Sequence, residues 1–182
     1  IVHWFLNVRG KTMPELTHFD EHGASRMVDV TGKEITFREA VAEAYVTLQP
    51  ETLRKIQHRE IAKGDVWEVA RLAGIMAAKK TADLIPLCHP LGLDGVEIQF
   101  DVMPDGRIRI QAATRIHART GVEMEALTAV SVAALTIYDC CKAIDRGMSL
   151  APIQLLEKPG GKSGTWKAKM SKPQRTKKRS EE

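Results

Sequence analysis

One long apolar segment limits the folds open to this chain more than any other feature of its sequence. The spacing of residues predicts a helix from Val122 to about Ile144, and its centre, Ala126–Tyr138, is nearly all small or apolar. A helix that is apolar around most of its circumference must be covered on several sides. In a chain of 182 residues, we therefore expect this helix to lie in the core and also at a subunit interface.

Three further helices are predicted before this segment. Thr36 and Glu39 form a capping box, and apolar residues at helical spacing follow, which predicts a helix ending near Pro50. A short helix is expected over Glu51–Gln57. Asp65 is a suitable N-cap for the next helix, and the face that we expect to be buried comprises Val66, Val69, Ala70, Ala73 and Ala77.

Alternating apolar and polar residues predict the strands. Val96–Val102 and Ile108–Ile116 alternate in this way, and Asp105-Gly106 between them is a strong hairpin signal. Shorter strands are expected over Met27–Val30 and Ile153–Leu156. The order of elements favours an α+β fold, a ferredoxin-like antiparallel sheet with helices packed on one face.

The two ends of the chain differ from its body. Met13-Pro14 resembles a natural start, so we interpret residues 1–12 as an artificial addition or an upstream extension and 13–170 as one domain. Residues 171–182 hold five basic and two acidic side chains, which is +3 of the net charge of +4, and we expect a basic disordered tail. The apolar opening stretch is too short to span a membrane and lacks the charged start of a signal peptide. Three cysteines, two of them adjacent, favour a reducing compartment, so the protein is expected in the cytoplasm.

Asp139 and Lys142 are the first candidates for chemistry. They lie three residues apart on one face of the long helix and can form an ion pair or act together as proton donor and acceptor. The alternative is an ordinary surface salt bridge. Tyr138, Cys140 and Cys141 around them predict partial burial, which would perturb the titration of the pair.

Glu123 and Glu125 stand at the start of the same helix, where carboxylates are electrostatically favoured. They are either structural or able to bind the N–H edge of a guanine-like ring. Cys88-His89 lies between two prolines, and this pair alone offers too few ligands for zinc, so no metal site is predicted. His89 is either a structural or a catalytic hydrogen-bonding group.

Lysines next to glycines suggest anion binding. Gly160–Gly164 with Lys158 and Lys162 can form a backbone nest for a phosphate, although the spacing does not match a phosphate-binding P-loop. Lys63 precedes the start of a helix and can also bind an anion. Both segments are equally consistent with solvated loops.

Longer segments resemble a known family. In chain order they are Met27–Val30, Lys63–Val66, Asp83–Leu91, Thr120–Ala129, Leu135–Asp139 and Gly160–Gly164. Together they closely resemble the cyclic pyranopterin monophosphate synthase family, molybdenum cofactor biosynthesis protein C. The similarity covers about Leu16 to Lys169.

This resemblance implies a function. It implies a lyase that converts (8S)-3',8-cyclo-7,8-dihydroguanosine 5'-triphosphate to cyclic pyranopterin monophosphate and diphosphate. It also implies a homohexamer, a trimer of dimers, with active sites shared across the dimer interface. No tightly bound cofactor is expected, although Mg²⁺ accompanying the triphosphate would fit.

The resemblance also implies roles for residues. Asp139 and Lys142 correspond to the catalytic acid–base pair, and Lys63 and Lys158 to lysines that transfer protons or bind phosphate. The residues expected to bind substrate are Leu87, Cys88, His89, Glu123, Met124, Glu125, Lys162 and Arg38.

Two other classes of function compete with this interpretation. A nucleic-acid-binding module would use the basic tail, but few aromatic residues and a nearly neutral body argue against it. A non-catalytic assembly subunit would use the apolar helix only to build an oligomer.

Overall fold

The computed structural model describes residues 22–160 and 164–168. The predicted domain limits at residues 1–12 and 171–182, and the part of the glycine-rich segment at 161–163, lie outside the described residues.

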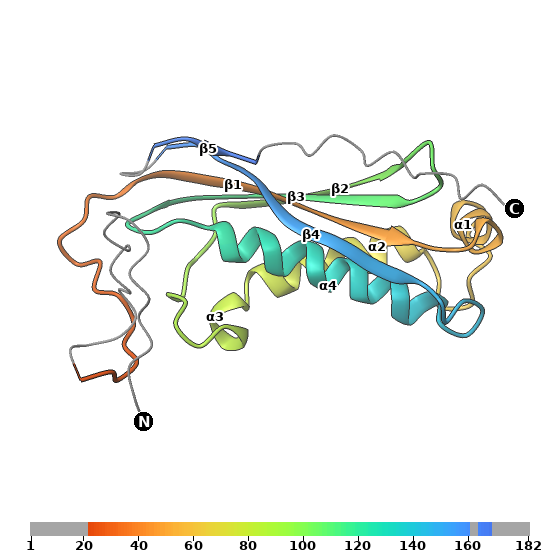
Figure 1. The fold of residues 1–182 in the computed structure, drawn as a ribbon, viewed down its shortest axis with the longest axis horizontal. Coiled ribbons are helices and arrows are strands. Elements are labelled where there is room, and N and C mark those ends of the chain that lie inside the picture. The colour runs from red at the N-terminus through yellow and green to blue at the C-terminus, as the bar shows by residue number, and fades with distance from the viewer. Residues whose placement is uncertain (1–21, 161–163, 169–182) are drawn as a thin grey trace, which may run out of the picture.

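A five-stranded antiparallel sheet forms one layer of the molecule. Its strands are β1 (Thr36–Thr47), β2 (Gly95–Val102), β3 (Ile108–Ala118), β4 (Ser149–Lys158) and β5 (Trp166–Lys167), in the spatial order β2-β3-β1-β4-β5. The helices α1 (Pro50–Gln57), α2 (Val66–Ala78), α3 (Thr81–Leu84) and α4 (Glu123–Cys141) complete the chain. In Figure 1, α2 and α4 lie side by side under one face of the sheet. The predicted α+β class is confirmed, whereas the finer ferredoxin-like assignment stays a prediction.

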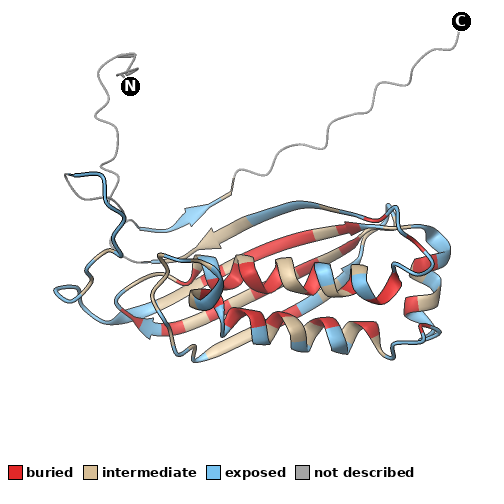
Figure 2. Cartoon of the chain, turned by 90° about the horizontal axis from the view of Figure 1, so that it is seen from below, coloured by how far each residue is buried: buried red, intermediate tan, exposed pale blue. Residues whose placement is uncertain are grey.

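The core between the sheet and the helices consists largely of alanine and β-branched residues. Ala40, Ala42 and Ala44 of β1 are fully buried against α4, which contributes alanines at matching positions. Figure 2 shows this buried stripe along the strands and the facing sides of α2 and α4. Small side chains let the two layers approach closely, as at Gly74, where an added Cβ would overlap Ile98.

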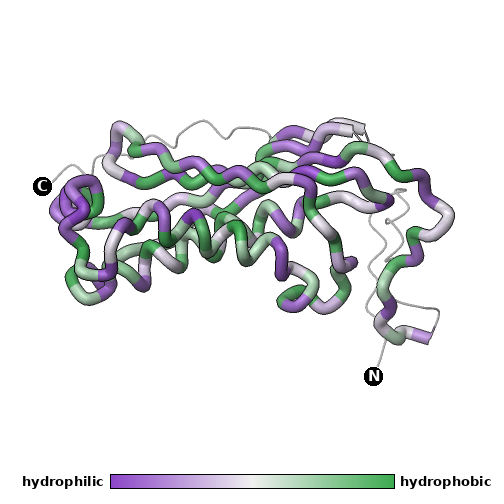
Figure 3. The backbone as a smooth tube through the Cα atoms, turned by 180° about the vertical axis from the view of Figure 1, so that it is seen from behind, coloured by the Kyte–Doolittle hydropathy of each residue, from purple (hydrophilic) through white to green (hydrophobic). Residues whose placement is uncertain are grey.

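The prediction of a helix over Thr36–Pro50 is wrong, because Thr36–Thr47 form the central strand β1. The apolar residues also fit a helical spacing, but the buried set Ala40, Ala42, Ala44 and Val46 has a period of two. Two neighbouring strands supply the ladder hydrogen bonds, so tertiary pairing outweighs the local capping signal. Hydrophilic and hydrophobic colours alternate along the strands in Figure 3.

The prediction of a strand over Met27–Val30 is also wrong, since this segment pairs with no strand in the part of the chain that the structure describes and leads into a turn. The helices around Glu51–Gln57 and after Asp65 are confirmed, and the Asp65 carboxylate accepts from the N–H groups of Trp67 and Glu68. Val69, however, is exposed rather than buried. The hairpin is confirmed, with Gly106 at φ +83°, where the turn needs a left-handed backbone.

The long apolar segment forms α4, and ten of its side chains are buried, as a core helix requires. By length and composition, it is the one helix among the described residues that could span a membrane. Its buried share of 56% and its position under the sheet identify it as the core helix of the domain.

The free edge of the sheet at β2 is covered by a cation. Arg71 of α2 donates from its guanidinium to the backbone carbonyl of Ile98. The same guanidinium lies 5.2 Å from the ring centre of Phe100, and its Nε is 3.1 Å from a carboxylate oxygen of Glu68.

Candidate functional site

Candidate residues gather at the two ends of α4. The amine–carboxylate group, which comprises Lys63, Asp139 and Lys142, lies at its C-terminal end, near α1. A hollow lies at its N-terminal end, next to the loop that follows α3.

The amine–carboxylate group is held by direct contacts. Lys63 Nζ is 2.6 Å from Asp139 Oδ2 and also donates to the Asp139 carbonyl at 3.0 Å. Lys142 Nζ is 2.8 Å from the other carboxylate oxygen, Asp139 Oδ1. One carboxylate therefore receives ammonium groups from two segments that are far apart in sequence.

The electrostatics of this group arise from pairing and not from burial. The hydrogen bond from Lys142, followed by that from Lys63, lowers the pKa of Asp139 to about 2, and the same contact raises the pKa of Lys142. All three side chains are more than half exposed, so the predicted partial burial of Asp139 and Lys142 in the subunit is wrong. Tyr138 and Cys140 turn toward other sides of the helix and leave this face open to solvent.

The hollow at the N-terminal end of α4 has a volume of about 310 Å³. It joins the loop after α3, the start of α4 and the segment before β1. Its lining includes the predicted substrate-binding residues Leu87, Cys88, His89, Glu123, Met124 and Glu125.

Glu123 and Lys158 form an ion pair beside this hollow. Lys158 Nζ is 2.5 Å from Glu123 Oε1, and each side chain is 25% exposed. The Glu123 carboxylate folds back over Gly121, where an added Cβ would overlap it. A glycine at this position therefore leaves the space in which Glu123 can reach β4.

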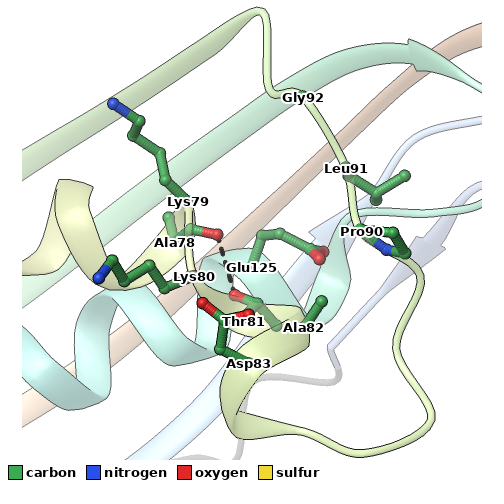
Figure 4. A pocket seen from close by; sticks show the side chains of 10 residues that line it. All are labelled: Ala78, Lys79, Lys80, Thr81, Ala82, Asp83, Pro90, Leu91, Gly92 and Glu125. Carbon is green, nitrogen blue, oxygen red and sulfur yellow. Dashed lines mark hydrogen bonds between the residues drawn. The ribbon is translucent and has the colours of Figure 1, made fainter.

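Glu125 is the most buried carboxylate of the candidate site, at 4% exposed. Burial, with repulsion from Glu123 as a smaller cause, raises the pKa of Glu125 to about 7. Its side chain also lines a second hollow of about 230 Å³. In Figure 4 the Glu125 carboxyl group points toward Pro90, which lines the same hollow. Near neutral pH this group can exchange a proton.

The loop after α3 is tied to the segment before β1. His89 Nε2 donates to the Val28 carbonyl at 2.8 Å, since a carbonyl oxygen can only accept. Burial, and then the Glu125 carboxylate, raises the pKa of the Cys88 thiol, so this thiol stays protonated.

Two predicted substrate-binding residues, Arg38 and Lys162, are not part of the described lining of the hollow. Arg38 is absent from its described lining, and Arg38 Nε donates to the carbonyl of Ala118 at the end of β3, 3.5 Å away. Lys162 lies outside the described residues. In residues 22–160 and 164–168, no group of three or more His, Cys, Asp or Glu side chains could hold a metal ion.

Part of the lining of the hollow at the N-terminal end of α4 was not predicted from the sequence. Val28, Val30 and Lys33 line the hollow, although the first two belong to the segment predicted as a strand. The Asp29 carboxylate accepts from the Thr31 N–H at 2.8 Å, so the segment turns there and brings Lys33 to the hollow. The Asx-turn sequence Asp29-Val30-Thr31 was the available signal.

The two ends of α4 are too far apart to form one small site within a subunit. Asp139 follows Glu125 by fourteen residues in the same helix. At 1.5 Å per residue, that separation is about 21 Å along the axis.

The chain is similar to a family of known proteins over most of its length. Residues 27–161 match the MoaC family. Three relatives carry the name cyclic pyranopterin monophosphate synthase, one of them with the suffix 1. The relative from Desulfitobacterium hafniense is 58% identical over 82% of this chain and 92% of its own length. The Thermomicrobium roseum relative is 59% identical over 85% and 94%, and the Mycobacterium tuberculosis synthase 1 is 58% identical over 86% and 92%.

Proposed function

This chain belongs to the MoaC family, and we propose that the two ends of α4 are two halves of an active site that is completed between subunits. Its function is that of a lyase in molybdenum cofactor biosynthesis. The enzyme converts (8S)-3',8-cyclo-7,8-dihydroguanosine 5'-triphosphate to cyclic pyranopterin monophosphate and diphosphate, in keeping with the name of its relatives.

The observation that carries the composite site is the separation of complementary chemistry along α4. One end offers ammonium groups on a carboxylate, and the other offers a hollow with a buried carboxyl group and a lysine at its rim. The described lining of the hollow does not include Lys63, Asp139 or Lys142 of the same subunit. A second subunit that places its own amine–carboxylate group at this hollow would complete the site.

Exposed apolar side chains support such an association. Leu72 and Met76 of α2 and Leu135 of α4 are 56–60% exposed on the helical layer. Large apolar side chains clustered on a surface mark sites of association. We assign this layer to subunit contacts in a homohexamer, a trimer of dimers with the active sites at the dimer interface.

The hollow supplies recognition of the substrate. An ionised Glu125 accepts N–H groups from the guanine-derived ring, and because these bonds favour the carboxylate, binding releases the proton that burial retains. Glu123, Met124 and the Leu87–His89 segment form the surrounding contacts.

We assign phosphate binding to basic residues, of which Lys158 pairs with Glu123 beside the hollow. Lys158 exchanges Glu123 for a phosphate oxygen, and Lys162 and Arg38 add positive charge. Lysines that neutralise the leaving diphosphate stabilise charge that develops in the transition state. The enzyme needs no tightly bound cofactor, and Mg²⁺ arrives with the triphosphate.

Proton transfer falls to the amine–carboxylate group. Opening and re-closing the rings of the substrate requires protons to be delivered and removed at several atoms. The ammonium groups of Lys63 and Lys142 donate to opposite oxygens of Asp139, so one ammonium can transfer its proton to the substrate while the carboxylate holds the other in place. We expect this chemistry in the cytoplasm, on a small-molecule substrate, with no role for a membrane or nucleic acid.

Single substitutions test the roles of these residues. Asp139→Ala or Lys142→Ala should abolish turnover, because each removes a proton-transfer partner, while the fold and oligomer stay intact. Product formation, circular dichroism and light scattering measure these effects. Near-normal product formation by either variant would refute the catalytic assignment.

Subunit mixing tests the composite site. Asp139→Ala and Lys158→Ala, each inactive alone, are co-expressed with different tags. In random dimers, about a quarter of the composite sites regain both intact halves, so roughly that fraction of activity should return. If each site lies within one subunit, no mixed oligomer contains an intact site, and activity stays absent.

A further inference from the structure

A buried carboxylate, Asp145, joins the turn after α4 to the start of α1. It lies outside the candidate site, but both of these segments lead to the amine–carboxylate group. Asp145 lies in the turn after α4 and is 6% exposed. Its Oδ2 accepts from the Gln49 N–H at 2.8 Å and from the Thr52 hydroxyl at 3.2 Å. Both donors belong to the start of α1, its N-cap and first turn, so Asp145 caps that helix from the far end of the chain.

The turn that carries Asp145 is fixed relative to the end of α4. The backbone N–H groups of Ile144 and Asp145 both donate to the Cys141 carbonyl, at 2.9 and 3.0 Å. The Tyr138 hydroxyl closes the turn by donating to the Arg146 carbonyl at 3.2 Å. The position of the Asp145 carboxylate is therefore set by the same helix end that bears Asp139 and Lys142.

Helix α1, whose start is bound by Asp145, leads along the chain to Lys63. Helix α1 ends at Gln57, and the chain reaches Lys63 six residues later through a loop held by local backbone bonds, such as Gly64 N–H to the Ile61 carbonyl at 3.0 Å. Thr52 and Ile56 are the buried residues of α1, which makes few contacts with other helices or strands. The orientation of α1 thus depends strongly on its cap.

We propose that Asp145 is a positioning residue that holds Lys63 against Asp139. This inference rests on the proposed role of the amine–carboxylate group. The Lys63–Asp139 ion pair is more than half exposed, and an exposed pair adds little stability, so it does not by itself fix the loop. The buried bonds of Asp145 supply that restraint, because both α1 and the end of α4 are anchored on one carboxylate.

Three substitutions remove the hydrogen bonds of Asp145 to different extents. Asp145→Ala removes both bonds, Thr52→Val removes one, and Asp145→Asn keeps an acceptor oxygen and should largely restore function. Val130→Ala is the matched control, since it destabilises the middle of α4 without touching the anchor.

Competitive amine acylation, read by mass spectrometry, reports the freedom of Lys63 in each full-length variant. Labelling of Lys63 should rise severalfold in Asp145→Ala and less in Thr52→Val. Labelling of Lys142, which reaches Asp139 from the same helix, should not change. The kcat should fall by at least about tenfold in Asp145→Ala, which is part of the roughly hundredfold or larger contribution of a positioned acid–base group, with KM nearly constant.

Unchanged Lys63 labelling in Asp145→Ala would overturn the inference while leaving the proposed function intact. An equal rise in Val130→Ala would also overturn it, because the effect would then be general loosening. Freed Lys63 with normal kcat would instead refute the role of Lys63 in turnover, which is part of the proposed function. If Asp145→Ala does not fold, Thr52→Val and Asp145→Asn give the same comparison.

Discussion

Replacing Glu125 with Gln should change how the stability of this protein depends on pH. Burial raises the pKa of Glu125 from 4.5 to about 7, so the folded state retains a proton that the unfolded chain releases near pH 4.5. Stability from this group is therefore fully present below pH 4.5 and is lost as the pH rises to about 7. A shift of that size corresponds to about 3 kcal/mol.

Urea unfolding at a fixed subunit concentration, from about pH 4.5 to about pH 8.5, measures the effect. Gln stays neutral at every pH, so the variant should gain up to about 3 kcal/mol relative to the natural sequence across this range. Glu60→Gln is a control of opposite sign, because the hydrogen bond from Arg54 lowers the pKa of Glu60 below 4.5, so the substitution should cost stability by an amount that hardly changes across this pH range. A difference between Glu125→Gln and the natural protein that does not vary with pH would refute the reasoning.

Two glycine substitutions test the close packing described above. Gly121→Ala should push the Glu123 carboxylate away from Lys158, so acylation of Lys158 should increase, and unchanged labelling would show that the carboxylate keeps its place. Gly74→Ala places a methyl group 2.9 Å from the Ala129 carbonyl of α4. Such overpacking should lower the free energy of unfolding by about 1–3 kcal/mol. The better helix propensity of alanine should offset about 1 kcal/mol of this loss. A more stable Gly74→Ala variant in urea unfolding would contradict this estimate.

The elements that sequence reasoning predicts correctly are those with a strong local signal. The core helix α4 and the hairpin around Gly106 have long, clean patterns, and Asp65 is followed directly by the N–H groups that it caps. Strand β1 resembles a helix in sequence because its buried alanines favour helices, and its ladder partners lie far away along the chain. No local pattern contains that pairing.

The same distinction applies to the candidate site. The Asp139–Lys142 contact follows from helical spacing, and it is present. The contact of Lys63 with Asp139 joins residues 76 positions apart, and spacing alone could not reveal it. The role of Asp145 could not be predicted from the sequence. It depends on hydrogen bonds from the Gln49 N–H and the Thr52 hydroxyl, and no sequence pattern shows that these donors lie near Asp145.

The guanidinium of Arg71 limits how this sheet could grow. A strand that tried to pair with the outer edge of β2 would need the Ile98 carbonyl, which already accepts from Arg71. The newcomer would also separate the guanidinium from the Phe100 ring and from the Glu68 carboxylate. Edge-to-edge aggregation of subunits at β2 is thereby disfavoured.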